Sequence, residues 1–337
     1  MGGRIGVHWL VTGGCGFIGA NLVADLMATP GQRVRILDDG SAGATSLAAL
    51  GVDARALDIR QADVRQADAV TAAARDVDVI VHLAGATGVP GSLADPLGDA
   101  TANVLGTLNV LQAARANRGR GGGARVVFAS TTGPLIGQAA TAQPSDAIDE
   151  TTLPAPSVPY GASKLAAEGY CRAYAHAYGV PTCVLRLTNV YGPGSDHKAG
   201  AVGRFLLDGI AGRALTITGD GGQTRDFLYV GDLVRALRLA AEHPNAVGGA
   251  PGQTFQIATG RATSIAGLAD AVGTLLAARG HPVPGLHHAP ARPADVRHTR
   301  ANPAKAAATL GWRADIGLAD GLARVYAHVT RQLADPV

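Results

Sequence analysis

Short apolar runs alternate with longer segments of helical periodicity through the first half of the chain. This alternation is typical of β-α units around a parallel sheet, because strands buried on both faces are apolar throughout. The apolar runs predict strands at residues 7–12, 33–38, 53–57, 79–83, 125–130 and 182–187. The segments between them predict helices at residues 17–27, 67–74, 96–117 and 160–178. We therefore expect an α/β fold with a doubly wound parallel sheet.

The pattern loosens after residue 187, where loops containing glycine and proline separate the apolar segments. Helices are predicted near residues 200–211, 230–241 and 264–278. Residues 254–258 read as one more buried strand, which would return the chain to the main sheet. We expect residues 1–187 to form mainly the first domain. Residues 188–337 should form mainly a smaller, interleaved C-terminal lobe, with a segment near 226–260 returning to the first domain.

Composition and charge narrow the class of protein. The 337 residues are 47% hydrophobic and 16% charged, and a net charge of +3 is spread along the chain, so we expect no nucleic-acid partner. No apolar run approaches the roughly 20 residues of a membrane span, so we expect no membrane partner either. Cys15, Cys171 and Cys183 lack the spacing of metal ligands, so we expect no metal site. Three such cysteines favour a reduced, cytoplasmic protein.

Three glycines stand between the first predicted strand and the first predicted helix. Gly13, Gly16 and Gly19 form the pattern G-x-x-G-x-x-G. The first glycine permits a tight turn, the second lets a pyrophosphate approach the backbone, and the third lets helix and strand pack closely. With Phe17 and Ile18 at the start of the helix, this turn predicts a dinucleotide site.

Acidic and small residues follow the next predicted strands. Asp38 ends the second strand, where its carboxylate can accept hydrogen bonds from a ribose and repel a 2′-phosphate, so NAD is favoured over NADP. Asp58 and Ile59 follow the third predicted strand and are candidates for contacts with adenine. The fourth strand leads into small residues that allow close approach of a cofactor, whereas His82 before them is interpreted as a packed structural residue. The candidates for contacts with the cofactor in this segment are Leu83, Ala84 and Gly85.

A tyrosine and a lysine lie one helical turn apart in the predicted helix 160–178. Tyr160 and Lys164 share a face of this helix. The ammonium group should stabilise phenolate and lower the pKa of the tyrosine, and it can also hold the nicotinamide ribose. The strand 125–130 runs into Ser130, Thr131 and Thr132, which supply hydroxyl groups beside them. Together with the glycine turn, this predicts nicotinamide redox chemistry.

Ordered motifs extend the pattern over nearly the whole chain. They are TGGCGFIG (12–19), NVLGTLN (103–109), YGASK (160–164), RLTNVYGP (186–193), GDGGQTRDF (219–227), RPADVRH (292–298) and LGW (310–312). With these motifs the chain resembles the extended short-chain dehydrogenase/reductases, and within them the NAD-dependent nucleotide-sugar epimerase/dehydratase family. The resemblance implies a Rossmann-type sheet, bound NAD with Asn103 among its contacts, and a second lobe that binds a nucleoside diphosphate sugar.

The second lobe carries side chains suited to such a substrate. Arg225 and Arg292 can neutralise a diphosphate, Asn189 can donate an amide hydrogen bond to it, and Asp295 can hold the nucleotide end. The resemblance adds further substrate candidates. These are Thr87, Val202 and Thr299.

The catalytic hydroxyl group has two candidates, because one residue is inserted in the loop after the strand. Counting forward from Phe128 gives Thr131, whereas counting back from Gly137 gives Thr132. We favour Thr131, because strand geometry fixes a position better than a loop does.

The resemblance also bears on the reaction. Dehydratases and decarboxylases of the family typically carry an acid just after the catalytic hydroxyl group, and the segment Ser130-Thr-Thr-Gly133 has none. This favours 4-epimerisation of a UDP-hexose or UDP-N-acetylhexosamine through a transient 4-keto sugar, and a small residue at Thr299 leaves room for an N-acetyl group.

Three alternatives stay open: a lyase that takes its acid from elsewhere, such as Asp95 or Asp196; an NAD-dependent dehydrogenase or 4-ketoreductase; and a non-catalytic NAD-binding protein. Family members commonly form dimers through the helices predicted at 96–117 and 160–178, which implies a homodimer.

Overall fold

The structure is a computed structural model of the 337-residue chain. It describes residues 6–41, 45–117, 123–137, 147–195, 200–243, 246, 252–291 and 296–334. No helix within these ranges is long and apolar enough to cross a membrane.

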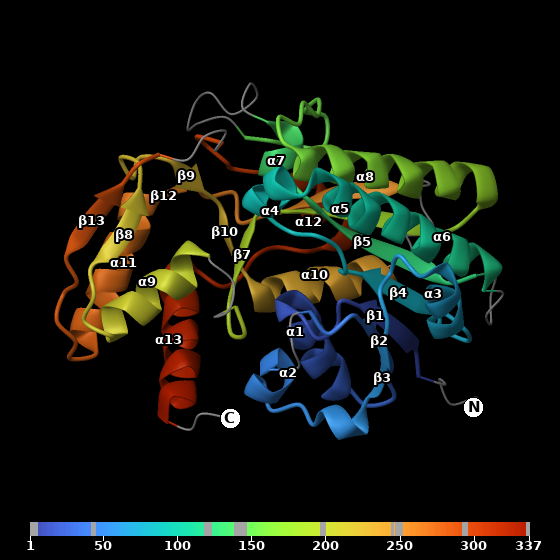
Figure 1. The fold of residues 1–337 in the computed structure, drawn as a ribbon, viewed down its shortest axis with the longest axis horizontal. Coiled ribbons are helices and arrows are strands. Elements are labelled where there is room, and N and C mark those ends of the chain that lie inside the picture. The colour runs from blue at the N-terminus through green and yellow to red at the C-terminus, as the bar shows by residue number, and fades with distance from the viewer. Residues whose placement is uncertain are drawn as a thin grey trace.

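Seven parallel strands form the central sheet (Figure 1), which confirms the predicted doubly wound fold. Their order is β11-β6-β5-β4-β1-β2-β3. The strands are β1 (His8–Thr12), β2 (Arg33–Asp38), β3 (Asp58–Gln61), β4 (Val79–His82), β5 (Arg125–Thr131), β6 (Thr182–Leu187) and β11 (Gln253–Ile257). The last of these comes from the C-terminal half and pairs with β6, as predicted for residues 254–258. All the strands therefore end along one edge, where ligands bind in such sheets.

The third strand begins later than predicted. Residues 53–57 contain a short 3-10 helix, η1 (Ala54–Ala56), whose first turn is capped by the Asp53 carboxylate accepting from the Arg55 amide. Pairing with β2 starts only where Asp58 lies beside Arg35. The prediction of a strand at 53–57 was wrong because this cap turns the chain before the sheet begins.

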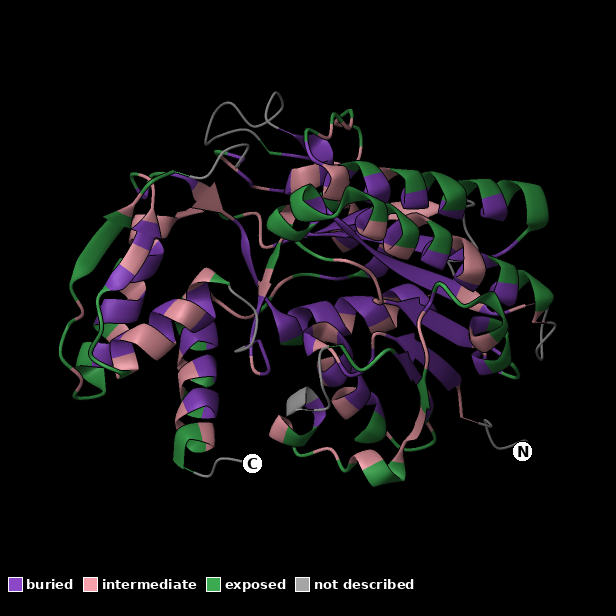
Figure 2. Cartoon of the chain, in the orientation of Figure 1, coloured by how far each residue is buried: buried purple, intermediate pink, exposed green. Residues whose placement is uncertain are grey.

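Helices cover both faces of the sheet, and the layer they enclose is buried (Figure 2). One face packs against α1 (Phe17–Met27), α2 (Thr45–Ala49), α10 (Val230–Glu242) and α12 (Ala304–Leu310). The other packs against α3 (Ala67–Ala73), α6 (Gly106–Ala116) and α8 (Pro159–Tyr178), with α5 (Pro96–Ala100) and the π-helix η2 (Thr101–Leu105) leading into α6. Trp9 and Val11 point to the first layer and Leu10 to the second, as the alternation of side chains along a strand requires.

The smaller lobe has its own apolar core. A parallel pair, β8 (Leu215–Thr218) and β13 (Leu286–Ala289), packs with α9 (Ala201–Ile210), α11 (Ile265–Ala278) and α13 (Leu318–Ala334). Two more short pairs are present: β7 (Asn189–Tyr191) with β10 (Phe227–Tyr229), and β9 (Thr224–Arg225) with β12 (Thr263–Ser264). Short helices α4 (Val89–Ala94) and α7 (Gly133–Ile136) follow β4 and β5. The sequence did not predict α2, α4, α7, α12 or α13.

Candidate active site

The glycine turn between β1 and α1 has no room for side chains at two of its positions. Gly13 has φ of 71°, and a side chain there would meet the Ala84 backbone nitrogen at 2.8 Å. A side chain on Gly19 would strike the Gly13 carbonyl oxygen. Gly16 is the N-cap of α1, so the first amides of the helix, which begins at Phe17 and Ile18, face the turn. This is a cradle for an anion such as a pyrophosphate.

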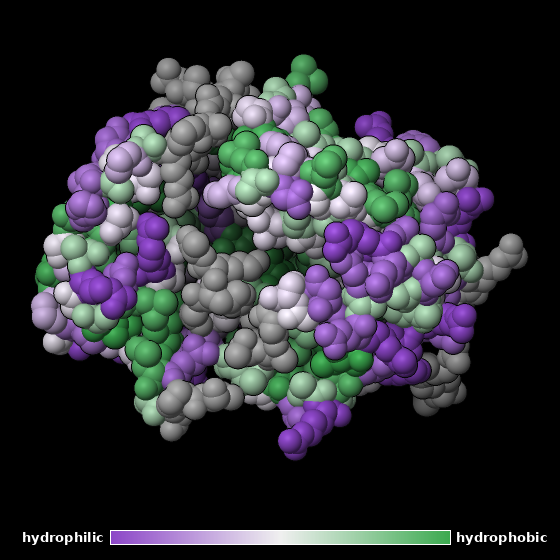
Figure 3. Space-filling model, in the orientation of Figure 1, coloured by the Kyte–Doolittle hydropathy of each residue, from purple (hydrophilic) through white to green (hydrophobic). Residues whose placement is uncertain are grey.

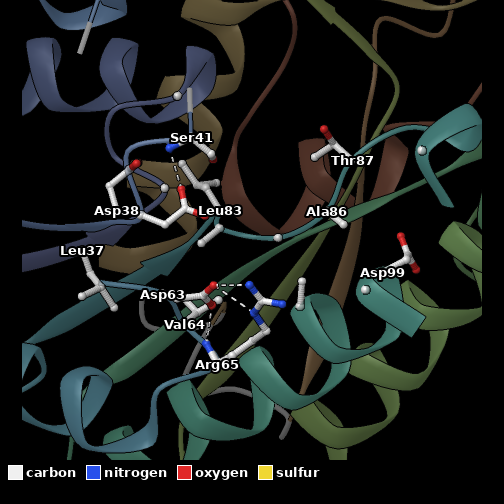
Figure 4. Close-up of a pocket in the computed structure, with 18 of the residues that line it drawn as sticks. Leu37, Asp38, Ser41, Asp63, Val64, Arg65, Leu83, Ala86, Thr87 and Asp99 are labelled. Carbon is white, nitrogen blue, oxygen red and sulfur yellow. Dashed lines mark hydrogen bonds and ion pairs between the residues drawn. The ribbon is translucent and has the colours of Figure 1, made fainter. Parts of the chain in front are cut away.

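Asp38 lies at the end of β2, on the wall of a pocket of about 540 Å³ that Gly13 and Gly16 also line (Figure 4). Its carboxylate accepts hydrogen bonds from the Cys15 and Gly40 amides, each at 2.9 Å. These bonds hold the carboxylate at the mouth of the turn. Negative charge in this place suits two ribose hydroxyl groups and opposes a 2′-phosphate.

Asp58 and Ile59 do not line this pocket in the structure. Asp58 lies at the start of β3 and forms ion pairs with Arg35 (2.8 Å) and Arg60 (2.7 Å), which lower the pKa of its carboxyl group against the effect of partial burial. Asp63 and Val64, which follow the same strand, line the pocket instead. The pocket-lining acid thus comes five residues after Asp58, as β3 itself begins five residues after the predicted strand.

The residues that follow β4 form part of the pocket wall. Leu83, Ala84 and Gly85 all line it, as predicted. His82 before them is fully buried, and its two ring nitrogens hydrogen-bond to Thr12 (2.8 Å) and Thr107 (3.1 Å). Burial, with the nearby Lys164 charge, lowers the pKa of His82 to about 3. The imidazole is therefore neutral and structural, as its sequence context indicated.

The tyrosine and lysine begin α8 and lie between two pockets. Lys164 is 4% exposed, and its ammonium group donates to the Ala129 carbonyl oxygen of β5 at 3.0 Å. A side chain built on Gly85 would come within 3.9 Å of Lys164 Nζ, so this lysine borders the cofactor pocket. Tyr160 lies beside Thr131, which lines a second cavity.

The two threonines at the end of β5 point to different partners. Thr131 interacts with Tyr160, whereas the Thr132 hydroxyl group donates to the buried Gln256 side chain of β11 at 2.8 Å. Gln256 in turn is held by the Glu150 carboxylate, which accepts from its backbone amide at 2.7 Å. Thr131 therefore lies beside the tyrosine, whereas Thr132 ties the end of β5 to β11.

The protonation of the pair differs from the expectation. Burial raises the pKa of Tyr160 to about 12, and the influence that lowers it is the hydrogen bond with Thr131. Lys164 was expected to lower this pKa, but its ammonium group is directed to Ala129 and lies over the Phe128 ring, 4.8 Å from the centroid. Burial lowers the pKa of Lys164 itself to about 8. In the protein alone, both groups are pushed toward their neutral forms.

The second cavity, of about 210 Å³, opens between the lobes. It brings together Thr131, Asn189, Arg225 and Thr299, four candidates that lie far apart in the sequence. None of the described residues that line it is acidic, and Arg225 contributes its positive charge. The cavity therefore suits an anionic, hydroxyl-rich ligand placed against Thr131.

The remaining substrate candidates lie elsewhere. Thr87 lines the cofactor pocket (Figure 4), close to where that pocket turns toward α4. Val202 is 3% exposed and packs in the core of the smaller lobe with Phe205, so its side chain is not part of the cavity. Arg292 and Asp295 lie outside the described residues.

Asn103 belongs to a buried polar cluster that sequence reasoning only partly found. Its amide group donates to the Ala86 carbonyl oxygen (3.2 Å), to Asp99 (3.1 Å) and to Ser163 (3.0 Å). Ser163 also donates to Asp99, at 2.5 Å. Asp99 and Ser163 were missed. Their signal was available in the helical spacing that places Asp99 four residues before Asn103 and Ser163 beside Lys164.

Comparison with known proteins agrees with this geometry. Residues 9–258 match the model of the "NAD dependent epimerase/dehydratase family". The UDP-glucose 4-epimerase of Mycolicibacterium smegmatis is 35% identical over 318 residues, covering 94% of this chain and 96% of the relative.

Solved structures give the same result. The crystal structure of UDP-glucose 4-epimerase with UDP-glucose from Thermotoga maritima has a TM-score of 0.85 and 30% identity, covering 97% of this chain and 100% of that one. The structure of UDP-glucose 4-epimerase from Thermus thermophilus in complex with NAD has a TM-score of 0.82 and 32% identity, covering 98% and 100%.

Proposed function

This chain belongs to the NAD-dependent epimerase/dehydratase family, and we infer that it catalyses the NAD-dependent 4-epimerisation of a UDP-sugar. One observation carries the inference. Thr131, next to Tyr160, lines a cavity that has an arginine and no acidic residue among its described lining, and Lys164, one turn after Tyr160, borders the dinucleotide pocket at Gly85.

The cofactor is NAD, as in the similar enzyme from Thermus thermophilus. The chain fits it: the glycine cradle leaves space where a pyrophosphate would lie, and Asp38 is placed for the ribose hydroxyl groups. We propose that Asp63 and Val64 contact the adenine and that Gly85, Asn103 and Lys164 lie at the nicotinamide end. Bound NAD supplies a hydride acceptor, a source for the hydride's return, and positive charge that favours phenolate.

The protein's own groups handle the proton. Tyr160 as phenolate accepts the proton of the sugar's 4-hydroxyl group and later returns it to the 4-keto sugar. Thr131 hydrogen-bonds the same oxygen and holds the phenol in place. Lys164 holds the nicotinamide ribose and stabilises the phenolate once the cofactor's charge is added. The sugar is released from the same cavity with inverted configuration at C4.

The diphosphate binds in the cavity through charge. Arg225 lies on β9 with its guanidinium group donating to the Thr224 carbonyl oxygen at 2.8 Å, which fixes its direction. Asn189 at the start of β7 is exposed to the same cavity and donates an amide hydrogen bond. Together they neutralise and orient the diphosphate while Thr131 meets the sugar.

A lyase is the competing reaction in this family. Elimination of water from the sugar needs an acid beside the reacting carbons, and no described residue lining the cavity carries a carboxyl group. Asp95 accepts from the Gly98 amide as the N-cap of α5 and lines the cofactor pocket instead. Asp196 lies outside the described residues.

A product assay distinguishes 4-epimerisation from the lyase and dehydrogenase reactions. The purified protein with bound NAD is incubated with UDP-glucose, UDP-N-acetylglucosamine, UDP-glucuronate and dTDP-glucose, and the products are identified by proton NMR. We expect 4-epimers of equal mass and no net NADH. We also expect turnover of the N-acetyl sugar, because Gly133 and Thr299, which lie next to each other on the cavity wall, are small. A loss of water or carbon dioxide, or accumulation of NADH, would refute epimerisation.

We propose a homodimer formed through α5, η2 and α8. Large apolar side chains are exposed on these helices and on α4, and apolar atoms gather over this face in Figure 3. They are Leu93, Leu97, Leu105, Tyr170 and Tyr178. A patch of this kind marks an interaction surface. Analytical ultracentrifugation should give twice the 33.9 kDa chain mass, and Leu97→Lys should shift the protein to monomer.

We propose that the protein works in the cytoplasm. All three cysteines are free and buried, which suits a reducing compartment. Burial, with the nearby Asp38 charge, raises the pKa of Cys15 to about 11, so this thiol is a small packing residue and not a reactive one. Fluorescence microscopy of a tagged protein tests the location.

A further inference from the structure

Asp99 is a buried carboxylate next to the catalytic helix for which the proposed reaction has so far no use. It lies on α5 at the edge of the cofactor pocket and is 3% exposed (Figure 4). Its partners are the Ser163 hydroxyl group at 2.5 Å and the Asn103 amide at 3.1 Å. Both donors are neutral, so these hydrogen bonds leave the negative charge of Asp99 uncancelled.

Lys164 is a buried cation that needs an opposite charge. Its ammonium group donates a hydrogen bond to a neutral acceptor, the Ala129 carbonyl oxygen. Glu168, one turn further along α8, is already matched, because the Arg186 guanidinium of β6 donates to both of its oxygens at 2.8 to 3.1 Å. A buried charge without a counter-charge is strongly unfavourable.

The other titratable groups around Lys164 are uncharged. Burial raises the pKa of the Cys171 thiol on α8, and burial lowers the pKa of the His82 imidazole on β4 to about 3. Tyr160 is a neutral phenol until it reacts, because burial raises its pKa. Among the described groups that face Lys164, Asp99 is the carboxylate available to balance its charge.

Two contacts connect Asp99 to the catalytic pair. Ser163 stands between Tyr160 and Lys164 on α8, and its hydroxyl group reaches both Asp99 and the Tyr160 carbonyl oxygen (3.1 Å). A side chain built on Gly85 would meet both Asn103 Oδ1 and, at 3.9 Å, Lys164 Nζ, so these two groups border the same small space. Asn103 Oδ1 has no hydrogen-bond partner among the described residues. The Asp99 cluster is thus continuous with the first turn of α8.

We propose that Asp99 is a positioning residue that provides the counter-charge of Lys164, anchors the first turn of α8 through Ser163, and sets the protonation of Tyr160 and Lys164 together. The proposal rests on the proposed epimerase function. The role of Asp99 goes beyond that function, because it assigns control over the protonation of Tyr160 and Lys164 to a residue that touches neither the sugar nor the reacting atoms.

The charge acts on both groups in the same direction. After the dominant effect of burial, the Asp99 carboxylate raises the pKa of Lys164, and it also raises the pKa of Tyr160. An attractive negative charge keeps the ammonium protonated, and the same charge opposes formation of phenolate. Removing it should therefore lower both pKa values, an effect that loss of packing alone would not produce.

The first test is the pH dependence of kcat for the NAD-loaded Asp99→Asn enzyme. We expect both limbs of the profile to move to lower pH, by about one unit each. Asp68→Asn, the same change at an exposed acid of α3, should leave both limbs in place. Ser163→Ala removes the anchor and keeps the charge, so kcat should fall without a shift of either limb. Unmoved limbs in Asp99→Asn, or limbs that move in opposite directions, would overturn the proposal.

The second test needs no substrate. The Tyr160 phenolate is titrated by its near-ultraviolet absorbance, as the difference between each protein and its Tyr160→Phe counterpart. We expect ionisation at lower pH in Asp99→Asn than in the parent, and an identical titration would refute the role of the charge. If the parent turns over no UDP-sugar, the proposed function fails while this titration still decides the role of Asp99. Should Asp99→Asn not fold, Asp99→Ser removes the same charge and leaves a hydroxyl group for Asn103.

Discussion

The cofactor pocket and the substrate cavity are built in different ways. The cofactor pocket is lined by residues 13–102, mostly backbone and short side chains at the ends of consecutive strands. The substrate cavity draws its lining from residues 89–299, mostly through side chains from both lobes. The cofactor pocket is formed by segments that are close in the sequence. The substrate cavity forms only after segments that are distant in the sequence have packed together. The cofactor is therefore held by a locally encoded pocket, whereas the sugar and the catalytic Thr131 meet in a cavity that depends on tertiary packing.

The largest effect on activity is expected from a substitution of the catalytic tyrosine. Tyr160→Phe should lower kcat by about a thousandfold or more, since it removes the proton-transfer group. NAD content, measured after release from the denatured protein, should stay at the parent's level, because the phenol hydroxyl group is not part of the glycine cradle. Full activity of this variant would remove Tyr160 from the mechanism.

The next test separates the neighbouring threonines. Thr131→Val should lower kcat by about a hundredfold, because it removes a hydrogen bond to the reacting oxygen. Thr132→Val leaves the buried Gln256 oxygen without its donor, so it should reduce the free energy of unfolding by about 1–3 kcal/mol with a smaller loss of kcat. Urea unfolding and steady-state kinetics measure the two effects. The reverse outcome would make Thr132 the catalytic hydroxyl group.

A substitution in the substrate cavity should leave the affinity for NAD unchanged. Arg225→Gln should raise KM for the UDP-sugar by about tenfold to a hundredfold, which corresponds to the loss of a charge-assisted hydrogen bond. NAD affinity measured by calorimetry should be unchanged. If NAD binding weakens equally, the two pockets are not separable as described.

The smallest effect is expected in the cofactor pocket. Asp38→Asn should weaken NAD binding by about tenfold and improve binding of NADP, because it removes charge while an amide oxygen can still accept from Cys15 or Gly40. Asp39→Asn changes the next, exposed acid and should have less effect. Equal NADP binding by the parent and Asp38→Asn would contradict the role of this charge.

The difference between the two pockets also explains which site residues could be predicted from the sequence. The glycine turn, Asp38 and the strand-end residues were predicted because their signals lie within a few residues of one another. Asp58 does not line the pocket because the cap at Asp53 shifts β3, and the pattern of acid, apolar residue and arginine at 58–60 recurs at 63–65, where Asp63 lines it. Val202 and the Asp99 cluster depend on which face of a helix meets which neighbour, and periodicity alone does not decide that.

The return of the chain to the main sheet limits how the protein can be divided. Strand β11 pairs with β6 from Cys183 to Leu187, and it is made by residues that follow part of the smaller lobe. A fragment ending at residue 187 would carry the entire glycine turn and Lys164 yet leave β6 as an open edge. Unprotected edge strands recruit other chains and aggregate. The NAD-binding half is therefore not an independent module for expression or grafting, although its sequence motifs read as one.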